Sequence, residues 1–475
     1  MTKVKVQDAT KQLSTNAGML FETVSRARKQ AQDTYGALKK ISDDLNRTEK
    51  QRLEMEAKEA LRKQYEAAAT YMTGYSTEQV SEIQEAASRA EKERARAAEE
   101  AAKAAKTIID EGPYKLYSTK NPDKDYMMLF AQENASTEEY ILAIRNSYEA
   151  QVYHNATAYT LLPTQGRPGY TRKFINMYLM KDGKAFTDKF KTEWQTMPFT
   201  EEVKDRDPRL AQSIRTPGYK RIGAKRVQGP DLGVTITGYQ PIKFVQDTTA
   251  SGGQIDRNDR STCDMPVFRY AEVLLNYAEA KAELGTLTQN DLAITVNEIR
   301  SRVGMRGLDM NEANKNIDWY LESKEYGYPN VTGANKGVIL EIRRERAVEL
   351  IQEGFRLQDL YRWKAGYCID QAISGMYFPG PGEYKLAGKE TADLILYKAG
   401  ETKPQAGEGV SVYELGSDII LSEGDKGYVY YHKTVENLRT PFNEERDYLY
   451  PIPSGERSLN PNLTQNPGWS DGLDF

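Results

Sequence analysis

Aromatic side chains gather in loop-like segments together with the polar groups that a sugar-type ligand needs. A sugar packs its C–H face on an aromatic ring, and its hydroxyls need fixed polar partners, because an unpaired buried polar group costs roughly 1–3 kcal/mol. The richest segment, residues 318–330, contains Trp319, Tyr320, Tyr326 and Tyr328 with the polar residues Asp318, Glu325 and Asn330. It is too polar to be core and lies between two predicted helices. We therefore expect it to be the main ligand platform.

Two further segments have the same character. Residues 376–384 place Tyr377, Phe378 and Tyr384 among glycines and prolines, and residues 153–170 offer Tyr153, His154, Tyr159 and Tyr170. For each of the three segments the alternative is a loop that anchors itself with its own aromatic rings. The candidate ligand-binding residues are Trp319, Tyr320, Tyr326, Tyr328, Asn330, Tyr377 and Phe378.

Catalytic and metal-binding patterns are weak. The carboxylate pairs Glu201-Glu202 and Glu444-Glu445 are expected by chance among 69 acidic residues. The sequence has no GxSxG elbow, P-loop or HExxH motif. Its two cysteines, Cys263 and Cys368, lack metal-site spacing, and two histidines leave little room for a histidine-based centre. We predict a binding protein and no enzyme, with no catalytic residue, metal or cofactor.

Composition sets the class of protein. With 475 residues, of which 39% are hydrophobic and 28% charged, the chain can bury a sizeable core. A net charge of −4 gives no reason to expect nucleic acid as a partner. No apolar run approaches the roughly 18 residues of a membrane-spanning helix.

The chain changes character near Gly112-Pro113. Residues 1–111 are rich in Ala, Glu, Lys and Arg, and the stretch 82–106 consists almost wholly of strong helix formers with Glu–Lys and Glu–Arg pairs three or four residues apart. We predict long, charged, coiled-coil-like helices there. Residues 112–475, rich in glycine, proline and tyrosine, are predicted to form a ligand-binding domain with long loops.

Helices in the second part are predicted from apolar spacing and caps. One begins with Asp264 as cap and Pro266 in the first turn and ends at Gly285, and a second runs from the Thr288 capping pair to Gly304. Together they form a hairpin of the tetratricopeptide type. The fold class is therefore mainly α, with tetratricopeptide-like hairpins, long loops and a minor β element, preceded by long charged helices.

Two more segments complete this outline. A third helix is predicted over residues 338–353. We expect Arg343 and Arg346 to form a partly buried ion network with Glu345 and Glu349, with an anion-binding cluster as the alternative. The β-branched runs in residues 232–247 predict the minor sheet or hairpin.

Three segments resemble one known family in their order and approximate spacing. They are PVFRYAEVLLNYAEA from Pro266, ILEIRRERAVELIQEGFRLQDLYRWK from Ile339, and YLYPIP from Tyr448 with LNPNLTQNPGW from Leu459. Together they make the chain similar to the SusD/RagB family from about residue 85 onward, so residues 112–475 resemble a SusD-like ligand-binding domain.

The resemblance implies a mostly helical outer-membrane lipoprotein of Bacteroidetes-type bacteria. Such proteins bind glycans at the cell surface as lids of SusC-like, TonB-dependent β-barrel transporters, and they take part in nutrient uptake without catalysis. The alternatives are the same lid role for peptide or other cargo, and a helical scaffold in which residues 1–111 form an oligomerising stalk. The sequence as written shows no secretory signal and no lipid-bearing cysteine. We therefore expect either a rearranged or incomplete start or a fused helical module, and any membrane anchoring is implied by the family only.

Overall fold

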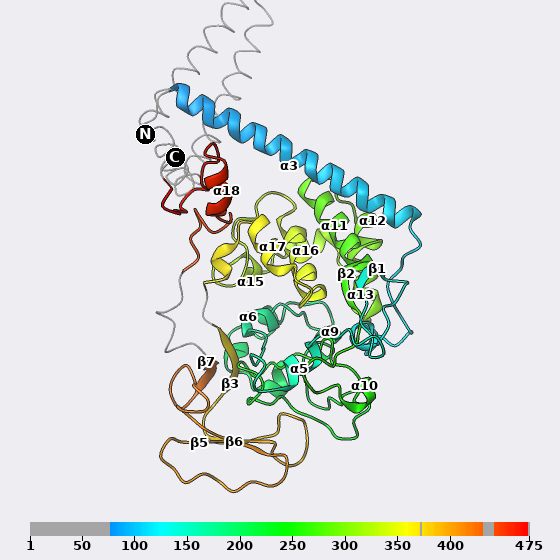
Figure 1. The fold of residues 1–475 in the computed structure, drawn as a ribbon, viewed down its shortest axis with the longest axis vertical. Coiled ribbons are helices and arrows are strands. Elements are labelled where there is room, and N and C mark those ends of the chain that lie inside the picture. Colours follow the sequence, from blue (N-terminus) through cyan, green and yellow to red (C-terminus); the bar gives the residue numbers. More distant parts are fainter. Residues whose placement is uncertain (1–76, 371–372, 431–440, 474–475) are drawn as a thin grey trace, which may run out of the picture. The chain divides into compact units, whose positions relative to one another are not determined.

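The computed structural model describes residues 77–370, 373–430 and 441–473 (Figure 1). Within these ranges the chain is mainly helical with a few short strands, which confirms the predicted fold class. The chain divides into two compact units, residues 1–97 and 98–475. The division falls inside helix α3 (Thr77–Glu111). The helices predicted before residue 77 lie outside the described part of the chain.

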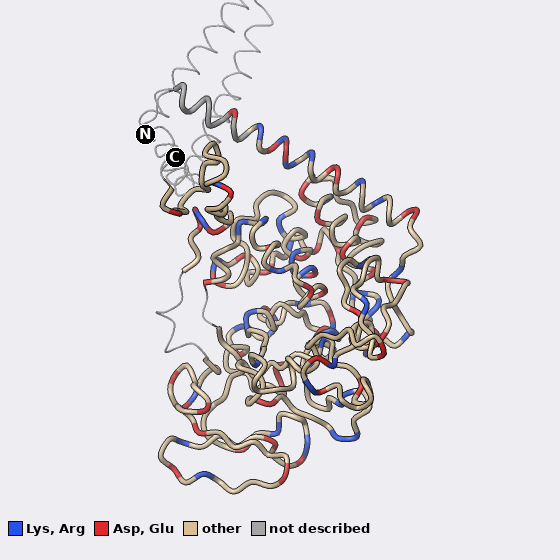
Figure 2. The backbone as a smooth tube through the Cα atoms, viewed as in Figure 1, with Lys and Arg blue, Asp and Glu red and all other residues tan. Residues whose placement is uncertain are grey.

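Helix α3 is long, charged and mostly exposed where its side chains are described. Positive and negative residues follow one another along it (Figure 2), and Glu85 pairs with Arg89 across one turn at 3.6 Å. This spacing supports a solvated helix. Among the described side chains of α3, Ala102 and Ala105 are buried, and they pack against Val273 and Tyr277 of the same unit, residues 98–475. The C-terminal part of α3 is therefore anchored by small apolar residues.

The helices of residues 112–475 are mostly short. The first group comprises α4 (Asp125–Ala131), α5 (Ala156–Leu161), α6 (Arg172–Ile175), α7 (Phe186–Lys189), η1 (Glu193–Thr196), α8 (Phe199–Glu202), α9 (Pro208–Ala211) and α10 (Ala250–Gly253). The second group comprises α11 (Tyr270–Glu283), α12 (Gln289–Ala293), α13 (Val296–Arg302), α14 (Met310–Lys315), α15 (Trp319–Glu322), α16 (Lys336–Glu349), α17 (Arg356–Arg362), η2 (Gly366–Cys368) and α18 (Ser454–Leu459). Within the described residues, no helix is long and apolar enough to cross a membrane.

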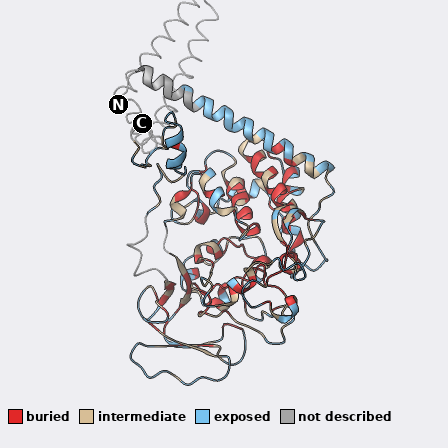
Figure 3. Ribbon diagram, viewed as in Figure 1, coloured by how far each residue is buried: buried red, intermediate tan, exposed pale blue. Residues whose placement is uncertain are grey.

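Helices α11 to α14 and α16 share one apolar core. Leu274 and Leu275 of α11, Ile299 of α13 and Ile342 of α16 are all fully buried in it. Helix α16 packs on α11 and α14. Figure 1 labels α16 in yellow and α11 in green. Figure 3 shows most of α16 as buried. This group of helices is the scaffold from which the loops of the molecule extend.

The predicted hairpin of residues 264–304 is correct in its two-helix outline and wrong in its start. Residues 265–269 form a strand, and the helix begins only at Tyr270. Asp264 does not cap this helix, because its carboxylate accepts hydrogen bonds from the backbone N–H groups of Asn146, at 2.8 Å, and Ala135, at 2.9 Å. Long-range pairing therefore overrides the local helix-start signal. The second helix is interrupted at residues 294–295 and becomes α12 and α13.

Three small sheets form the minor β element. The strand at the start of α11, β2 (Met265–Arg269), pairs antiparallel with β1 (Tyr140–Ile144). The other strands are β3 (Ser374–Phe378), antiparallel to β7 (Gly427–Tyr430), and β4 (Gly382–Tyr384), β5 (Leu394–Tyr397) and β6 (Ser411–Glu414), in the order β4-β5-β6. The prediction of a sheet in residues 232–247 is wrong. That segment is fully described and makes only a single β-bridge, between Pro241 and Ile214. Its apolar residues are buried, but the backbone that carries them forms turns and loops rather than strands.

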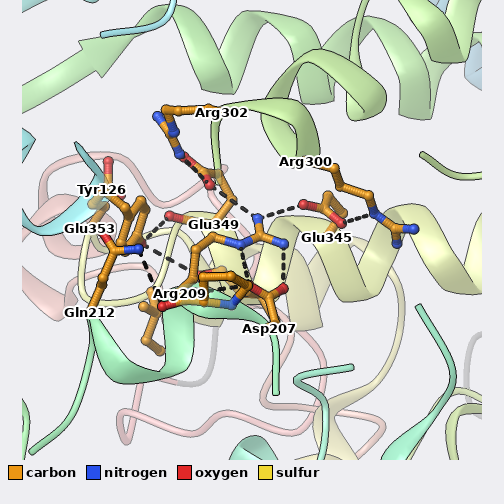
Figure 4. A network of polar contacts seen from close by, with 12 residues as sticks. Tyr126, Asp207, Arg209, Gln212, Arg300, Arg302, Glu345, Glu349 and Glu353 are labelled. Atoms are coloured by element: carbon orange, nitrogen blue, oxygen red, sulfur yellow. Dashed lines mark hydrogen bonds and ion pairs between the residues drawn. The ribbon is translucent and has the colours of Figure 1, made fainter. Parts of the chain in front are cut away.

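Helix α16 takes part in a buried ion network (Figure 4). The predicted pairing is wrong, because Glu345 and Glu349 bind arginines of other elements, while Arg343 pairs with Glu283 and Arg346 with Glu279 and Asp359. Glu349 is wholly buried and accepts from Arg302 at 2.6 Å and from Arg269 at 2.8 Å. Glu345 accepts from Arg209 at 2.5 Å and from Arg300 at 2.8 Å. The partners of these carboxylates come from α9, α13 and β2, so the network joins elements that are far apart in sequence.

A buried lysine extends the same network. The Lys243 ammonium donates to Glu353 at 2.6 Å, to the carbonyl of Ile351 at 2.8 Å and to the Tyr126 hydroxyl at 3.0 Å. Burial lowers the pKa of Lys243 to about 8, although Glu353 acts in the opposite direction. All three protons of the ammonium have acceptors. The network is therefore a structural clamp, with its guanidinium and ammonium groups occupied by carboxylates of the protein.

Candidate ligand-binding site

The loop that carries the first predicted platform is held by α16. Arg344 of α16 forms an ion pair with Asp318 and donates a hydrogen bond to the carbonyl of Met177 at 2.9 Å. Asp318 in turn caps helix α15 by accepting from the backbone N–H of Tyr320 at 2.8 Å. Helix α15 contains Trp319 and Tyr320. Helix α16 therefore holds the first aromatic residues of the site in place through Arg344 and Asp318.

Four aromatic rings form one compact group. Tyr320 and Tyr326 stack with ring centroids 4.4 Å apart and planes 5° apart. Trp194, from η1, meets Tyr320 edge-on at 6.0 Å and Tyr326 at 6.1 Å. Trp319 meets Tyr320 edge-on at 5.7 Å. These are favourable aromatic geometries, so the rings stabilise one another in fixed orientations.

Residues of helix α6 and the adjoining Asn176 form hydrogen bonds with Tyr320 and Trp194 of this group. The Tyr320 hydroxyl accepts from the side-chain amide of Asn176 and donates to the carbonyl of Lys173, both at 3.3 Å. Arg172 is buried, donates to the carbonyl of Trp194 and pairs with buried Glu202 at 3.4 Å. The short helix therefore fixes the inner rings through both its side chains and its backbone.

Arg172 also connects the first predicted segment to the second. Its guanidinium carbon lies 4.8 Å from the centre of the Tyr428 ring and 5.9 Å from that of Trp194. Tyr428, on β7, packs against Tyr377, on the paired strand β3, with centroids 5.8 Å apart. Strand β3 also contacts η1. The structure thus brings Trp319, Tyr326 and Tyr377 to one region, although they come from separate loops.

The aromatic rings of the site differ in their exposure to solvent, which shows which of them could contact a ligand and which support the others. Trp319 is 43% exposed, and Tyr326, Tyr377 and Tyr428 are half-buried. Trp194 and Tyr320 are buried beneath them, at 4% and 1% exposure. A set of partly exposed rings on a rigid, buried aromatic base is the kind of surface on which a sugar ring stacks.

The phenols of Tyr326 and Tyr428 stay protonated at neutral pH. Burial raises the pKa of Tyr326, and the neighbouring Glu325 raises it further. Burial also raises the pKa of Tyr428, against the opposing charge of Arg172. Both hydroxyl groups therefore remain neutral, and the Tyr326 hydroxyl donates to the carboxylate of Glu325.

The remaining predicted site residues have other surroundings. Tyr328 and Phe378 are almost fully buried members of the main core, so in this conformation they offer no ring face to a ligand. Asn330 is exposed, and its side-chain amide donates to the carbonyl of Trp363 at 2.7 Å. The third aromatic segment is not part of the group: Tyr170 lies in the core, and His154 binds the carbonyl of Cys263 at 2.8 Å.

Three residues of the group were not anticipated from the sequence. Trp194 and Arg172 lie outside the three segments selected from the sequence, although aromatic residues flank both of them. Tyr428 lies in the alternating stretch Gly427–Tyr430, which is a pattern typical of a strand and was a usable signal. All three become recognisable only when the chain brings η1, α6 and β7 together.

The fold and the site define a mainly helical protein that presents aromatic rings on long loops. Residues 127–469 match the model of the SusD family. The match covers most of the chain, and the protein therefore belongs to the SusD family, which confirms the resemblance seen in the sequence.

Several solved structures are similar to this chain. A SusD-like protein from Bacteroides fragilis aligns with a TM-score of 0.48 and 18% identity, over 79% of this chain and 62% of that one. A SusD-like carbohydrate binding protein from the same species aligns with a TM-score of 0.47 and 23% identity, over 76% of this chain and 60% of that one. A SusD superfamily protein from Parabacteroides distasonis aligns with a TM-score of 0.39 and 20% identity, over 79% of this chain and 58% of that one. The chain thus spans about three fifths of the length of these proteins. No curated protein matches it.

Proposed function

We propose that the protein binds a glycan through the partly exposed rings of Trp319, Tyr326, Tyr377 and Tyr428. The observation that carries this proposal is the stacked and edge-on aromatic group, held rigid by Arg172 and α15 while its outer rings remain accessible. A preorganised surface loses little entropy on binding. Family membership and the printed description of one similar structure as carbohydrate binding support the same class of ligand.

In this proposal the protein works at the cell surface of the outer membrane as the lid of a SusC-like, TonB-dependent transporter. It captures oligosaccharide or polysaccharide for uptake and does not hydrolyse it. The support for this role is family membership. Co-purification of the tagged protein with a TonB-dependent β-barrel from a native host tests the partnership, and recovery of the protein without such a barrel contradicts it.

A panel of soluble polysaccharides in native affinity gels tests the binding function. We expect retardation by one polysaccharide class and a fall in affinity of about tenfold or more in Trp319→Ala. The reason is that an aromatic ring that becomes buried when the ligand binds contributes on the order of 1.5–3 kcal/mol. Tyr159→Ala is the matched control, since Tyr159 is 44% exposed but is not part of the group.

Two results would contradict the proposal. The first is equal retardation of the parent and Trp319→Ala by every polysaccharide that binds. The second is a folded parent protein that binds no polysaccharide but binds a peptide added to the panel. This result would favour the alternative, in which the cargo is a peptide.

A further inference from the structure

A second cluster of functional groups lies where α16 and α17 meet the end of the 318–330 loop. Tyr328 and Trp363 pack edge-on with ring centroids 5.4 Å apart. The guanidinium carbon of Arg343 lies 5.4 Å from the Tyr328 ring centre and 4.7 Å from that of Trp363. The corresponding distances for Arg356 are 5.7 Å and 6.0 Å. Two guanidinium groups therefore border the same two rings.

Arg343 of α16 and Arg356 of α17 differ from Arg344 and Arg346 of α16 in their hydrogen bonding. Arg343 is only 5% exposed, and its one ion pair is a 3.5 Å contact between Nη2 and Glu283. Within the described residues, Nε and Nη1 of Arg343 and Nη1 of Arg356 are buried without a hydrogen-bond partner. The Tyr328 hydroxyl accepts a hydrogen bond from Arg356, which leaves its own proton to be donated. Buried polar groups normally have partners, and a buried charge without them is costly. The cluster therefore contains buried N–H donors that could bind an additional acceptor.

The local charge is positive as well. Lys173 belongs to the same neighbourhood, since burial lowers its pKa and Arg356 contributes to the lowering. The nearby carboxylates are Glu283 and Glu279 near Arg343, Glu325 near Lys173, and Asp359. Glu279 is already paired with Arg346 and Arg362. Asp359 already accepts from Arg346 at 3.1 Å and from Arg362 at 2.9 Å. In the Glu349 network, by contrast, every arginine has at least one close carboxylate.

We propose that Arg343, Arg356 and the hydroxyl of Tyr328 bind one oxyanion, a sulfate or carboxylate group. The planar fork of a guanidinium matches two oxygens of such a group, and a phenol hydroxyl donates to a third. Arg356, Lys173 and Cys368 are half-buried, so the cluster reaches the surface. The oxyanion is either a free inorganic ion or an acidic substituent of a sugar. The proposal stands apart from glycan binding at the aromatic group.

Calorimetric titration of the full chain with sodium sulfate tests it, with sodium chloride of equal ionic strength as the reference. We expect saturable binding of one sulfate per chain, with affinity reduced about tenfold or more in Arg356→Gln, which removes one charged fork. Tyr328→Phe removes only the hydroxyl and keeps the buried ring, so it remains folded and binds several-fold more weakly. Arg306→Gln, at an exposed pair with Glu312, is the control and binds as the parent does.

A second arm identifies the source of the oxyanion. N-acetylglucosamine 6-sulfate that binds more tightly than inorganic sulfate, with the same loss in Arg356→Gln, indicates a sugar substituent, and equal or weaker binding indicates a free ion. The proposal is wrong if sulfate has no effect beyond chloride, or if Arg356→Gln and Tyr328→Phe bind sulfate as the parent does. Failure here with intact binding of a neutral glycan leaves the proposed function untouched.

Discussion

Buried arginines perform distinct tasks in this protein. Arg269 contacts Glu139, Glu349 and Glu353 at 2.6–2.8 Å and is a structural cross-link. Arg172 braces aromatic rings, and Arg343 retains unpaired donors. The difference lies in the number of carboxylates around each guanidinium, because a saturated ion network has no capacity for an external anion.

Glu349→Gln tests the structural role of the network. The substitution keeps the shape of the side chain but removes the charge that Arg302, Arg269 and Arg209 share. Breaking a buried ion pair leaves uncompensated charge, so we expect a loss of about 3–5 kcal/mol in the free energy of unfolding. Urea denaturation followed by circular dichroism measures it.

The matched control is Glu312→Gln, because Glu312 pairs with Arg306 on the surface, with both side chains at least half exposed. Exposed pairs contribute less than about 1 kcal/mol. If both variants unfold at the same urea concentration, the network does not stabilise the fold in the way described.

Among the elements, the short helices depend on caps and packing rather than on length. Isolated helices below about 12–15 residues are marginal in water, and α12 has 5 residues while α15 has 4. Helix α12 has the predicted capping box: the Thr288 side chain accepts from the N–H of Asp291 at 3.1 Å, and Asp291 accepts from the N–H of Thr288 at 2.8 Å.

Thr288→Ala removes one half of this capping box. We expect the free energy of unfolding to fall by about 1 kcal/mol, because one N-terminal N–H group of α12 loses its acceptor. Urea denaturation measures the change. Thr286→Ala, two residues earlier and outside the helix, is the control with unchanged stability, and an equal loss in the two variants would assign the effect to the loop rather than to the cap.

For the whole molecule, the carboxylates of the network determine how stability depends on pH. Burial alone would raise the pKa values of Glu345, Glu349 and Glu353, but the adjacent guanidinium and ammonium groups outweigh burial and lower them. Each pKa is thus lower in the folded than in the unfolded protein. The resulting stability is present above pH 4.5, the usual value for glutamate, and is lost as the pH falls toward the folded-state values.

We therefore expect the melting temperature to be nearly constant from pH 7 to about 5 and to fall steeply below about pH 4.5. Calorimetry at a series of pH values measures this dependence. Glu349→Gln, which has one perturbed carboxylate fewer, should show a shallower fall. A parent protein whose melting temperature does not change down to pH 3 would contradict the assignment.

The sequence by itself determined the family, the mainly helical class, the charged helix α3 and the capping box of α12. These follow from local patterns: helix-forming composition, apolar spacing, and a cap placed three residues before its partner. It also located the loop of Trp319 and Tyr326, because aromatic residues among polar ones indicate a chain segment outside the core.

Only the tertiary structure decided which aromatic residues face solvent. Tyr320 and Tyr328 lie in the same loop as Trp319, yet both are buried, because their rings pack against Trp194 and Trp363 from distant segments. Asp264 has the residue type of a helix cap, and the pairing of β2 with β1 gave it another role. Burial and ion pairing depend on which distant residues meet, and this information is absent from the local pattern on which a sequence-based prediction rests.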